Sequence, residues 1–563
     1  MLHVRWLGTV RYRDALALQH GLFEHGSPDS HLLLLEHPHV YTLGVRAELT
    51  NLLVAPADVG AELVHADRGG DITYHGPGQL VGYPILDVPS KRGGGMADTA
   101  AYVRGVEQLV IEALADLGLQ GVGRIAHPGV WVEPEGARPR KIAAVGVRLA
   151  RGRSMHGFAL NVDPDMDMFE HIVPCGIADK GVTSLAAEGV AVSMREVVDA
   201  VSARATSRWG GHGTTRSDVV WRERPEDLSP FSRGDGAGPA LTRLMTRRAE
   251  AGVTEAVVIA KPKPDWVKTR LRLGDAVLRT KRTVRAAGLV TVCEEAGCPN
   301  LTECWSEGTA TFMVNGERCT RACGFCLIDT RHPGPPDPGE PERVADAVAS
   351  MGLRFAVITT VARDDLSDEG ASQIVRTIEA VRSRCPGTGV EVLISDCRGE
   401  PVALESIFAA APDVLNHNLE TVARLQRAVR PSASYARSLA VLARAKHAGL
   451  TTKSGLMVGL GETVGELRAA LADLRAVGVD IVTIGHYLQP TANHLPVARW
   501  WTPDELTALK AYGEGLGIAH IEATPLTRSS HHAGSAFAAA RAEPEGAVAI
   551  ASPQRRPAAL MAR

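Results

Sequence analysis

The chain has 563 residues, 45% of them apolar, and this length predicts two domains rather than one compact core. Its formal net charge is -3, from 61 basic and 64 acidic residues mixed along the chain, which gives no signature for nucleic acid or an anionic membrane. No run reaches the roughly 18 apolar residues of a membrane helix, and the N-terminal segment lacks a signal-peptide apolar stretch. We therefore expect a cytoplasmic protein, in which clustered cysteines indicate metal binding or catalysis rather than disulfides.

The first half predicts an α+β domain, because short β-type runs outnumber stretches with helical spacing. The predicted strands cover residues 31–38, 39–43, 61–67, 79–88, 129–133, 141–150 and 155–162. The predicted helices cover residues 101–118 and 194–210.

Two reactive side chains stand out in this half. Cys175 lies alone between Pro174 and Gly176, which suggests a turn and an exposed thiol, although a small buried hydrophobe is an equally simple interpretation. Lys141 begins an otherwise apolar strand, where a lysine either reaches solvent or is held as a base with a lowered pKa. A cysteine attacks as a thiolate, so a nearby amine is the partner that it needs.

A glycine-rich stretch, "RGGDITYHGPGQLVGYPIL", permits close backbone approach to a ligand, although it also fits a bare hairpin turn. Together with "PGVWV", "KIAAVGV", "MHGFALNV" and "VPCGIADKGVTSL" it resembles the lipoyl(octanoyl) transferases, over roughly residues 30 to 190. That family shares an α+β fold with biotin protein ligases and lipoate ligases. The resemblance implies that Cys175 takes an octanoyl group from an acyl carrier protein and passes it to a lipoyl-domain lysine, with Lys141 as general base.

The resemblance also implies a set of substrate-binding residues. They are Arg68, Gly69, Gly70, Tyr74, His75, Gly76, His156 and Gly157. The two histidines among them would help to line the acyl or phosphopantetheine pocket, or they are simply core histidines. A lipoate ligase would instead activate a free acid with ATP and would need no cysteine.

The second half has a βα rhythm, which predicts parallel strands joined by helical crossovers in a barrel or a doubly wound sheet. The predicted strands cover residues 309–314, 354–361, 390–395, 413–420, 454–460, 480–488 and 520–526, and the predicted helices include 342–352, 372–384 and 435–449. Ligands gather at the carboxyl ends of such strands.

Six of the nine cysteines lie between residues 293 and 326, in two groups of three. Cys293, Cys298 and Cys304 follow C-x4-C-x5-C, and Cys319, Cys323 and Cys326 follow C-x3-C-x2-C. Structural zinc sites usually pair two C-x2-C units, which this pattern does not. Three thiolates around a 4Fe-4S cube leave one iron free to bind another group, so iron-sulfur is favoured over zinc or structural thiols.

The second triad, placed after a first strand, resembles the radical S-adenosylmethionine enzymes, and the first triad is similar to lipoyl synthases in particular. Further motifs carry the likeness over roughly residues 260 to 540, among them "RDDLSDEGA", "NHNLETVARLQRAVRP", "KSGLMVGLGET" and "YLQPTANHLPVARWWTPDE". This resemblance implies a partial (β/α) barrel of the radical S-adenosylmethionine type.

The family implies two 4Fe-4S clusters. Cys319, Cys323 and Cys326 would hold the cluster that chelates and cleaves S-adenosylmethionine, and the resulting radical would activate a protein-bound octanoyl chain. The other triad would hold an auxiliary cluster that donates two sulfur atoms. Its fourth ligand is a serine of an R-S-S-Y motif, here "TRSSHHAG", which indicates Ser530 with Ser529 as the alternative. His531 replaces the motif's tyrosine, His486 stands where glutamine is usual, and Cys397 replaces an aromatic residue.

The two resemblances together predict a bifunctional enzyme of lipoate assembly. Its expected parts are a transferase domain at 1–222, a linker at 223–250, a lipoyl synthase domain at 251–542 and a Pro/Ala-rich, disordered tail at 543–563. The implied partners are octanoyl-acyl carrier protein, lipoyl domains of 2-oxoacid dehydrogenases, the glycine cleavage H protein, and a ferredoxin or flavodoxin, with no nucleic acid or membrane. Two rivals stay open: another radical sulfur-inserting enzyme fused to a ligase-like module, and a zinc-stabilised lipoyl-domain adaptor without catalysis.

Overall fold

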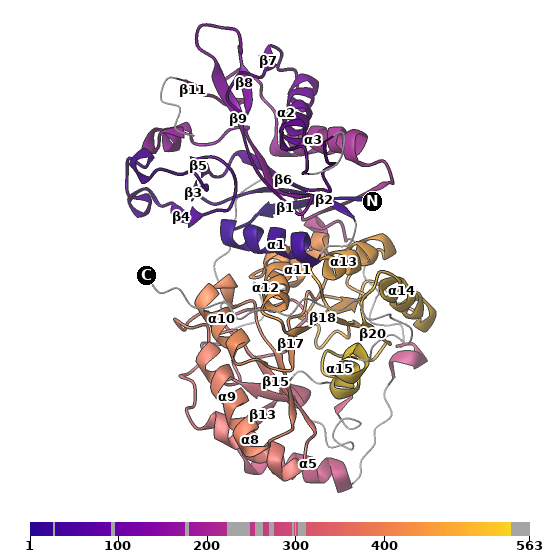
Figure 1. Ribbon diagram of the computed structural model, residues 1–563. Helices are drawn as coiled ribbons and strands as arrows, with labels where there is room; N and C mark the ends of the chain where they lie inside the picture. Colours follow the sequence, from indigo (N-terminus) through magenta and orange to yellow (C-terminus); the bar gives the residue numbers. More distant parts are fainter. Residues whose placement is uncertain are drawn as a thin grey trace.

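The computed structural model divides into two halves that meet along helix α1, Tyr12–His25 (Figure 1). It describes residues 1–25, 29–91, 96–174, 180–221, 248–253, 263–268, 275–295, 298, 300–301 and 311–541. The first half is the indigo and magenta part of Figure 1, and the second half is the orange and yellow part.

The first half is built on a mixed sheet whose strand order is β12-β1-β2-β6-β10-β9-β8-β7, with β11 paired to β9. Its strands are β1 Leu2–Thr9, β2 Ser30–Glu36, β6 Gln79–Ile85, β7 Val122–Gly123, β8 Val130–Val132, β9 Arg140–Ala150, β10 Arg153–Asn161, β11 Gly181–Val182 and β12 Thr214–Asp218. A smaller sheet, ordered β4-β3-β5, contains β3 Val40–Leu43, β4 Glu62–His65 and β5 Ile72–His75.

Helices cover both faces of the larger sheet. α2, Thr99–Asp116, and α3, Met194–Trp209, share one apolar core with β1, β2, β8 and β10. A capping box of Ser193 and Glu196 fixes the start of α3, because each side chain accepts a hydrogen bond from a backbone N–H that the helix leaves unpaired. Helix α1 packs on the opposite face, against β2 and β6. The predicted α+β domain is confirmed, but α1 was not among the predicted helices.

The second half contains a sheet in strictly sequential order, β13-β14-β15-β16-β17-β18-β19-β20, in which β14 to β20 are all parallel. Its strands are β13 Val290–Thr291, β14 Thr311–Val314, β15 Phe355–Thr360, β16 Gly389–Leu393, β17 Val414–Asn416, β18 Thr451–Val458, β19 Ile481–His486 and β20 His520–Ala523. Sequential parallel order is the arrangement of a barrel, whereas a doubly wound sheet reverses its order at a switch point. The barrel-type alternative of the sequence prediction is therefore the correct one.

Helical crossovers join these strands and cover the outside of the sheet (Figure 1). The helices of this half are α5 Asp275–Ala286, α6 Val292–Glu295, α8 Glu340–Met351, α9 Ala371–Arg384, α10 Pro401–Ala409, α11 Gln426–Val429, α12 Tyr435–His447, α13 Val464–Ala476, α14 Pro503–Gly515 and α15 Ala533–Arg541. No helix of the described residues is long and apolar enough to cross a bilayer.

The two halves share one hydrophobic core. Leu18 and Leu22 of α1 belong to the same cluster as Leu439 of α12 and Leu474 of α13. Gly21 allows α1 and α12 to approach closely, because a Cβ added at Gly21 would lie 2.6 Å from the Cβ of Ala443. Most of the predicted linker and the whole predicted tail lie outside the described residues, but Arg248, near the linker's end, is buried.

A buried ion pair crosses the same boundary. Nε of Arg5, in β1, donates to both carboxylate oxygens of Asp473, in α13, at 2.9 and 3.1 Å. The hydroxyl of Tyr435 donates to the same carboxylate at 2.9 Å. Arg5 and Asp473 are 2% and 5% exposed, so removal of one partner would leave the other charge inside the protein.

We predict that Arg5→Met lowers the free energy of unfolding by about 3 kcal/mol, because breaking a buried pair leaves an uncompensated charge. Denaturant unfolding of the full-length protein, followed by tryptophan fluorescence, measures the change. Arg204→Met is the matched control, since it removes an ion pair with Asp116 in which both side chains are 39% exposed, and it should cost much less than Arg5→Met. Equal losses in the two variants would contradict the prediction.

Candidate functional site

A cavity lies between the two sheets of the first half, beside β6, β9 and β10. Six of the eight predicted substrate-binding residues line it: Arg68, Gly69, Gly70, His75, His156 and Gly157. Apolar and aromatic side chains complete the wall, including Tyr12 of α1, Tyr83 of β6 and Phe158 of β10. Sequence reasoning missed these three. Strand alternation could have suggested that Tyr83 shares a face of β6 with Val81, but it carries no signal for Tyr12, which lies in a helix.

Arg68 anchors the loop between β4 and β5. Its Nη2 donates to the carbonyl and the hydroxyl oxygen of Thr42 at 2.7 and 2.8 Å, and the Gly69 amide donates to the Val147 carbonyl of β9 at 3.0 Å. These bonds hold the glycine-rich loop against the cavity wall. Gly157 is required on the other side, because a Cβ there would lie 2.2 Å from the Gly82 carbonyl oxygen.

The two predicted pocket histidines are neutral and held by hydrogen bonds. Nδ1 of His75 lies 2.7 Å from Oε1 of Gln79, and Nε2 of His156 lies 2.6 Å from Oδ1 of Asp67. Burial lowers the pKa of both imidazoles, most strongly for His75. The amide of His156 also donates to Gln19 of α1 at 2.9 Å, so α1 touches this wall directly.

Tyr74 and Gly76 do not line the cavity. The hydroxyl of Tyr74 lies 2.7 Å from Nδ1 of His39, and its ring packs edge-on against Phe169 in a separate apolar cluster. Gly76 lies against the Tyr74 side chain, since a Cβ there would overlap the Tyr74 hydroxyl. These two residues therefore support the small sheet rather than the cavity.

Lys141 lies in β9 and is 6% exposed. Its ammonium group lies 4.8 Å from the centre of the Trp131 ring, a cation–π contact. Cys175 lies outside the described residues, but β11, which follows it in the chain, pairs in parallel with β9 through Val182 and Lys141. Val182, seven positions after Cys175 in the sequence, thus lies beside Lys141.

Cys319, Cys323 and Cys326 lie in the loop that follows β14, at the carboxyl edge of the parallel sheet. Sγ of Cys319 accepts hydrogen bonds from the amides of Arg321 and Ala362 at 3.4 and 3.3 Å. The Cys326 carbonyl lies 2.9 Å from Nε2 of His494. The loop is therefore tied to residues that follow other strands of the sheet.

These three thiols fit a metal cluster. Burial raises the pKa of Cys323 to about 11 and that of Cys326 to about 12, and it also raises the pKa of Cys319. The charges of neighbouring thiols add to the rise, so the three groups are close together. Three thiols this close together in one loop have the arrangement of a metal-ligand set.

The first triad is described only in part. Cys304 lies outside the described residues, and of Cys293 only the backbone in α6 is described. Cys298 is half-buried, and burial raises its pKa while the nearby charge of Arg528 lowers it. Asn300 donates to the Leu526 carbonyl at 2.7 Å. The chain around Cys298 therefore lies against the loop that contains the predicted serine ligand.

That loop follows β20, and its two serines differ. Nδ2 of Asn418 donates to Oγ of Ser529 at 2.6 Å, whereas Ser530 is half-buried beside it. The substituted His531 stacks on His532 with ring centroids 3.8 Å apart. The other substitution, His486, is accommodated in the core: the Trp501 amide donates to its Nε2 at 3.2 Å, and burial lowers its pKa to about 4.

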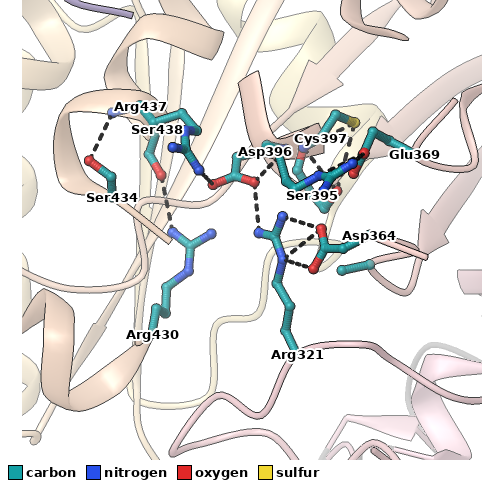
Figure 2. A network of polar contacts seen from close by, with 12 residues as sticks. Arg321, Asp364, Glu369, Ser395, Asp396, Cys397, Arg430, Ser434, Arg437 and Ser438 are labelled. Atoms are coloured by element: carbon teal, nitrogen blue, oxygen red, sulfur yellow. Dashed lines mark hydrogen bonds and ion pairs between the residues drawn. The ribbon is translucent and has the colours of Figure 1, made fainter. Parts of the chain in front are cut away.

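Arginines and carboxylates surround the second triad, and sequence reasoning did not single them out. Figure 2 shows Arg321 between Asp364 and Asp396, with Arg437 on the far side of Asp396. The position of Arg321 between two cysteines was the available signal, because an arginine in such a loop must be paired when buried. Cys397 lies nearby in the core cluster, and Cys385 packs against that cluster, as expected for packing thiols.

Comparisons with known proteins match each half separately. The model of the lipoyl protein ligase A/B catalytic domain matches residues 11–206, and that of the radical SAM superfamily matches residues 313–474. A solved bi-partite lipoate protein ligase from Thermoplasma acidophilum is 18% identical and covers 39% of this chain and 87% of that chain. Its TM-score of 0.31 is too low to support any conclusion.

Two curated relatives match the second half almost end to end. The lipoyl synthase of Mycobacterium tuberculosis (strain ATCC 25618 / H37Rv) is 50% identical over 304 residues, which is 54% of this chain and 96% of the relative. The lipoyl synthase of Mycolicibacterium smegmatis is 49% identical over 303 residues, 54% of this chain and 94% of the relative. Together with the domain model of the first half, these matches support a role in lipoate biosynthesis. The chain belongs to the lipoyl synthase family and carries a lipoyl protein ligase A/B catalytic domain fused ahead of it.

Proposed function

We propose that this protein carries out two consecutive steps of lipoate assembly. The first half transfers an octanoyl group from acyl carrier protein to the lysine of a lipoyl domain, and the second half inserts sulfur at carbons 6 and 8 of that chain. The observation that carries the proposal is the presence, in one chain, of a mostly apolar cavity lined in part by β9, the strand that carries the buried Lys141, and of a half-buried three-thiol loop at the carboxyl edge of a parallel sheet. The order of the halves matches the order of the reactions.

In the first step, Cys175 acts as the nucleophile. Its thiolate attacks the octanoyl thioester carbonyl, the carrier's thiolate leaves and takes a proton from Lys141, and an acyl-enzyme forms. The lipoyl-domain lysine then attacks this thioester and gives a proton to Lys141, and the Cys175 thiolate departs. The low exposure of Lys141 and its place on β9, a strand that lines the cavity, support this role.

The cavity supports an acyl chain as the substrate. Its wall is mostly apolar, with Val81, Tyr83, Phe158 and Ala159 on neighbouring strands. The neutral His75 and the Asp67-bound His156 place polar atoms at defined points of the wall without adding a free charge. Such a cavity favours a hydrocarbon chain over a charged substrate.

A lipoate ligase activity is the alternative for this half, because the matching domain model is that of the lipoyl protein ligase A/B catalytic domain. A ligase would need ATP, whereas a transferase needs Cys175 and an acyl thioester. Octanoate with ATP, supplied in place of octanoyl-acyl carrier protein, distinguishes the two: labelling of a lipoyl domain only from the thioester supports the transferase.

In the second half, Cys319, Cys323 and Cys326 would hold one 4Fe-4S cluster, and Cys293, Cys298, Cys304 and Ser530 would hold an auxiliary one. When bound, the clusters and S-adenosylmethionine supply radical hydrogen abstraction and sulfur. The chain's own residues bury the thiols and hold their loop through the Ala362 amide and His494. Asn418 donates a hydrogen bond to the Ser529 hydroxyl and so gives that serine a structural role, which favours Ser530 as the ligand.

The partners follow from these two steps. We propose octanoyl-acyl carrier protein as acyl donor, and the lipoyl domains of 2-oxoacid dehydrogenases and the glycine cleavage H protein as acceptors. A ferredoxin or flavodoxin would supply electrons. A cytoplasmic location would give the protein access to the acyl donor, the acceptors and the electron donor. A coupled anaerobic assay tests the whole proposal: with octanoyl-acyl carrier protein, apo lipoyl domain, reductant and S-adenosylmethionine, the mass of the lipoyl domain should rise first by an octanoyl group and then by two sulfurs.

We predict that Cys175→Ala abolishes the covalent octanoyl adduct, since no other group provides the nucleophile. Intact mass spectrometry after incubation with octanoyl-acyl carrier protein measures the adduct. Cys385→Ala is the matched control and should keep it, because Cys385 packs against a core in the other half. An adduct that persists in Cys175→Ala shows that the nucleophile is a different residue.

We predict that Lys141→Met lowers the rate of octanoyl transfer by a factor of about 10² or more, the usual contribution of a general base. Single-turnover transfer to a lipoyl domain measures this rate. A rate within about threefold of the unmodified protein would rule out this role.

We predict about eight irons and eight sulfides per anaerobically purified chain, as expected for two 4Fe-4S clusters. Cys319→Ala should lower both to about four, because the auxiliary cluster uses the other triad. Cys397→Ala is the control, since this thiol lies in the core and accepts a hydrogen bond from the Ser395 hydroxyl. Two zinc ions and no sulfide would instead favour the non-catalytic adaptor, and a different sulfur-bearing product would favour another radical enzyme.

A further inference from the structure

Arg321 links the second cysteine triad to the rest of the protein. It lies between Cys319 and Cys323, and its backbone amide donates to the Sγ of Cys319 at 3.4 Å. The position of this one residue therefore affects both the shape of the loop and the environment of a thiol. Its side chain is 6% exposed, so its charge must be balanced inside the protein.

Two carboxylates neutralise the Arg321 charge, and each follows a different strand of the parallel sheet. Asp364, beyond β15, binds Arg321 in a bidentate manner, with Nε at 2.8 Å from Oδ2 and Nη2 at 2.6 Å from Oδ1. Asp396, beyond β16, accepts Nη1 at 2.7 Å and is 0% exposed. Figure 2 shows the guanidinium held between these two groups. Paired carboxylates on a planar guanidinium fix its orientation as well as its charge.

The ion pairs continue from Asp396 into the first half of the protein. Nη1 of Arg437, in α12, lies 3.7 Å from Oδ2 of Asp396, a contact drawn in Figure 2. Nε of the same arginine donates to Oδ2 of Asp14, in α1, at 3.2 Å. Charges thus alternate from the cysteine loop to α1 in the order Asp364, Arg321, Asp396, Arg437, Asp14; we call these five residues the charge chain.

The two ends of the charge chain depend on each other, because water contributes little to the neutralisation of these five charges. Asp14 is 1% exposed, and Oδ1 of Asp14 and Oδ2 of Asp396 are buried oxygens without a hydrogen-bond donor among the described residues. Arg11 and Arg444 also face Asp14, at 3.2 and 3.7 Å. Loss of the Asp14 charge would leave three arginines around a neutral group, and Arg437 would then be drawn toward Asp396.

We propose that Asp14, a residue of the acyltransferase-like half, is a positioning residue for the Cys319–Cys326 loop and acts on it through Arg437, Asp396 and Arg321. The first half thereby sets the geometry of S-adenosylmethionine binding in the second half. This inference rests on the proposed function only in assigning that loop to the S-adenosylmethionine cluster. Helix α1 also carries Tyr12, which lines the acyl cavity, so one helix contacts both sites.

The test is Asp14→Asn in the full-length, anaerobically reconstituted protein. We expect iron content and octanoyl transfer to be unchanged, the KM for S-adenosylmethionine to rise about tenfold with a smaller change in kcat, and the electron paramagnetic resonance signal of the reduced protein to shift. A displacement of about 1 Å at a reacting centre has effects of at least this size. Asp116→Asn is the matched control, because Asp116 lies on α2 in an exposed ion pair.

A second pair of variants covers the case in which Asp14→Asn does not fold. Arg437→Lys keeps the charge but not the fork that reaches two carboxylates, and Arg437→Gln removes both. We expect the KM to rise in both variants and less in Arg437→Lys. The inference is overturned if the unmodified protein shows the cluster signal and these variants reproduce its KM and spectrum. Absence of any cluster signal in the unmodified protein would instead refute the proposed function.

Discussion

The burial of helix α1 on two opposite sides is the constraint on which the rest of this structure depends. One side of α1 packs on β2 and β6, and the other packs on α12 and α13, so the apolar residues of both halves form one continuous core. An ordinary two-domain chain has separate cores and a more polar contact surface. Here the boundary contains Leu18, Leu22 and Leu439, and it also contains the buried pair of Arg5 and Asp473. The halves are therefore held in one arrangement.

The second constraint is the parallel sheet of the other half. Since β14 to β20 all run in one direction, the segments that follow them meet at one edge. The cysteine loop follows β14, Asn418 follows β17, and Ser529 follows β20. Residues far apart in sequence become neighbours for this topological reason. The cysteine loop brings three thiols close together at this edge, which is the arrangement of a metal-ligand set.

The sequence predicted the regular elements well where the pattern was local. The βα rhythm, the parallel strands and the helices at 342–352, 372–384 and 435–449 are all present. The strand predicted at 413–420 is shorter, Val414–Asn416, because its later residues turn away to supply Asn418 and Glu420 to the site. Helix α1 was not predicted, since Asp14, Gln19 and Gly21 interrupt its apolar positions.

Only those parts of the candidate site that form a spacing pattern in the sequence could be predicted. The cysteine triads and the glycine-rich loop were visible as patterns, and Arg68, His75 and His156 do line one cavity. The family resemblance placed Tyr74 with them, but in a strand neighbouring side chains point to opposite faces. Asp14, Asp396 and Asp473 resemble ordinary surface carboxylates in the sequence. Their burial arises from tertiary packing, between the two halves for Asp14 and Asp473 and within the second half for Asp396, and no local pattern encodes it.

The close approach at Gly21 has a consequence for how such a fusion can evolve. Any side chain at that position would meet Ala443 and wedge the two helices apart. A free-standing homologue of the first half has no reason to keep a glycine there, because nothing would press against its helix. A new N-terminal domain gained by recombination would therefore need a glycine at the position of Gly21, facing an alanine at the position of Ala443. The two halves can pack in this way only if both residues of the contact, Gly21 and Ala443, are inherited together.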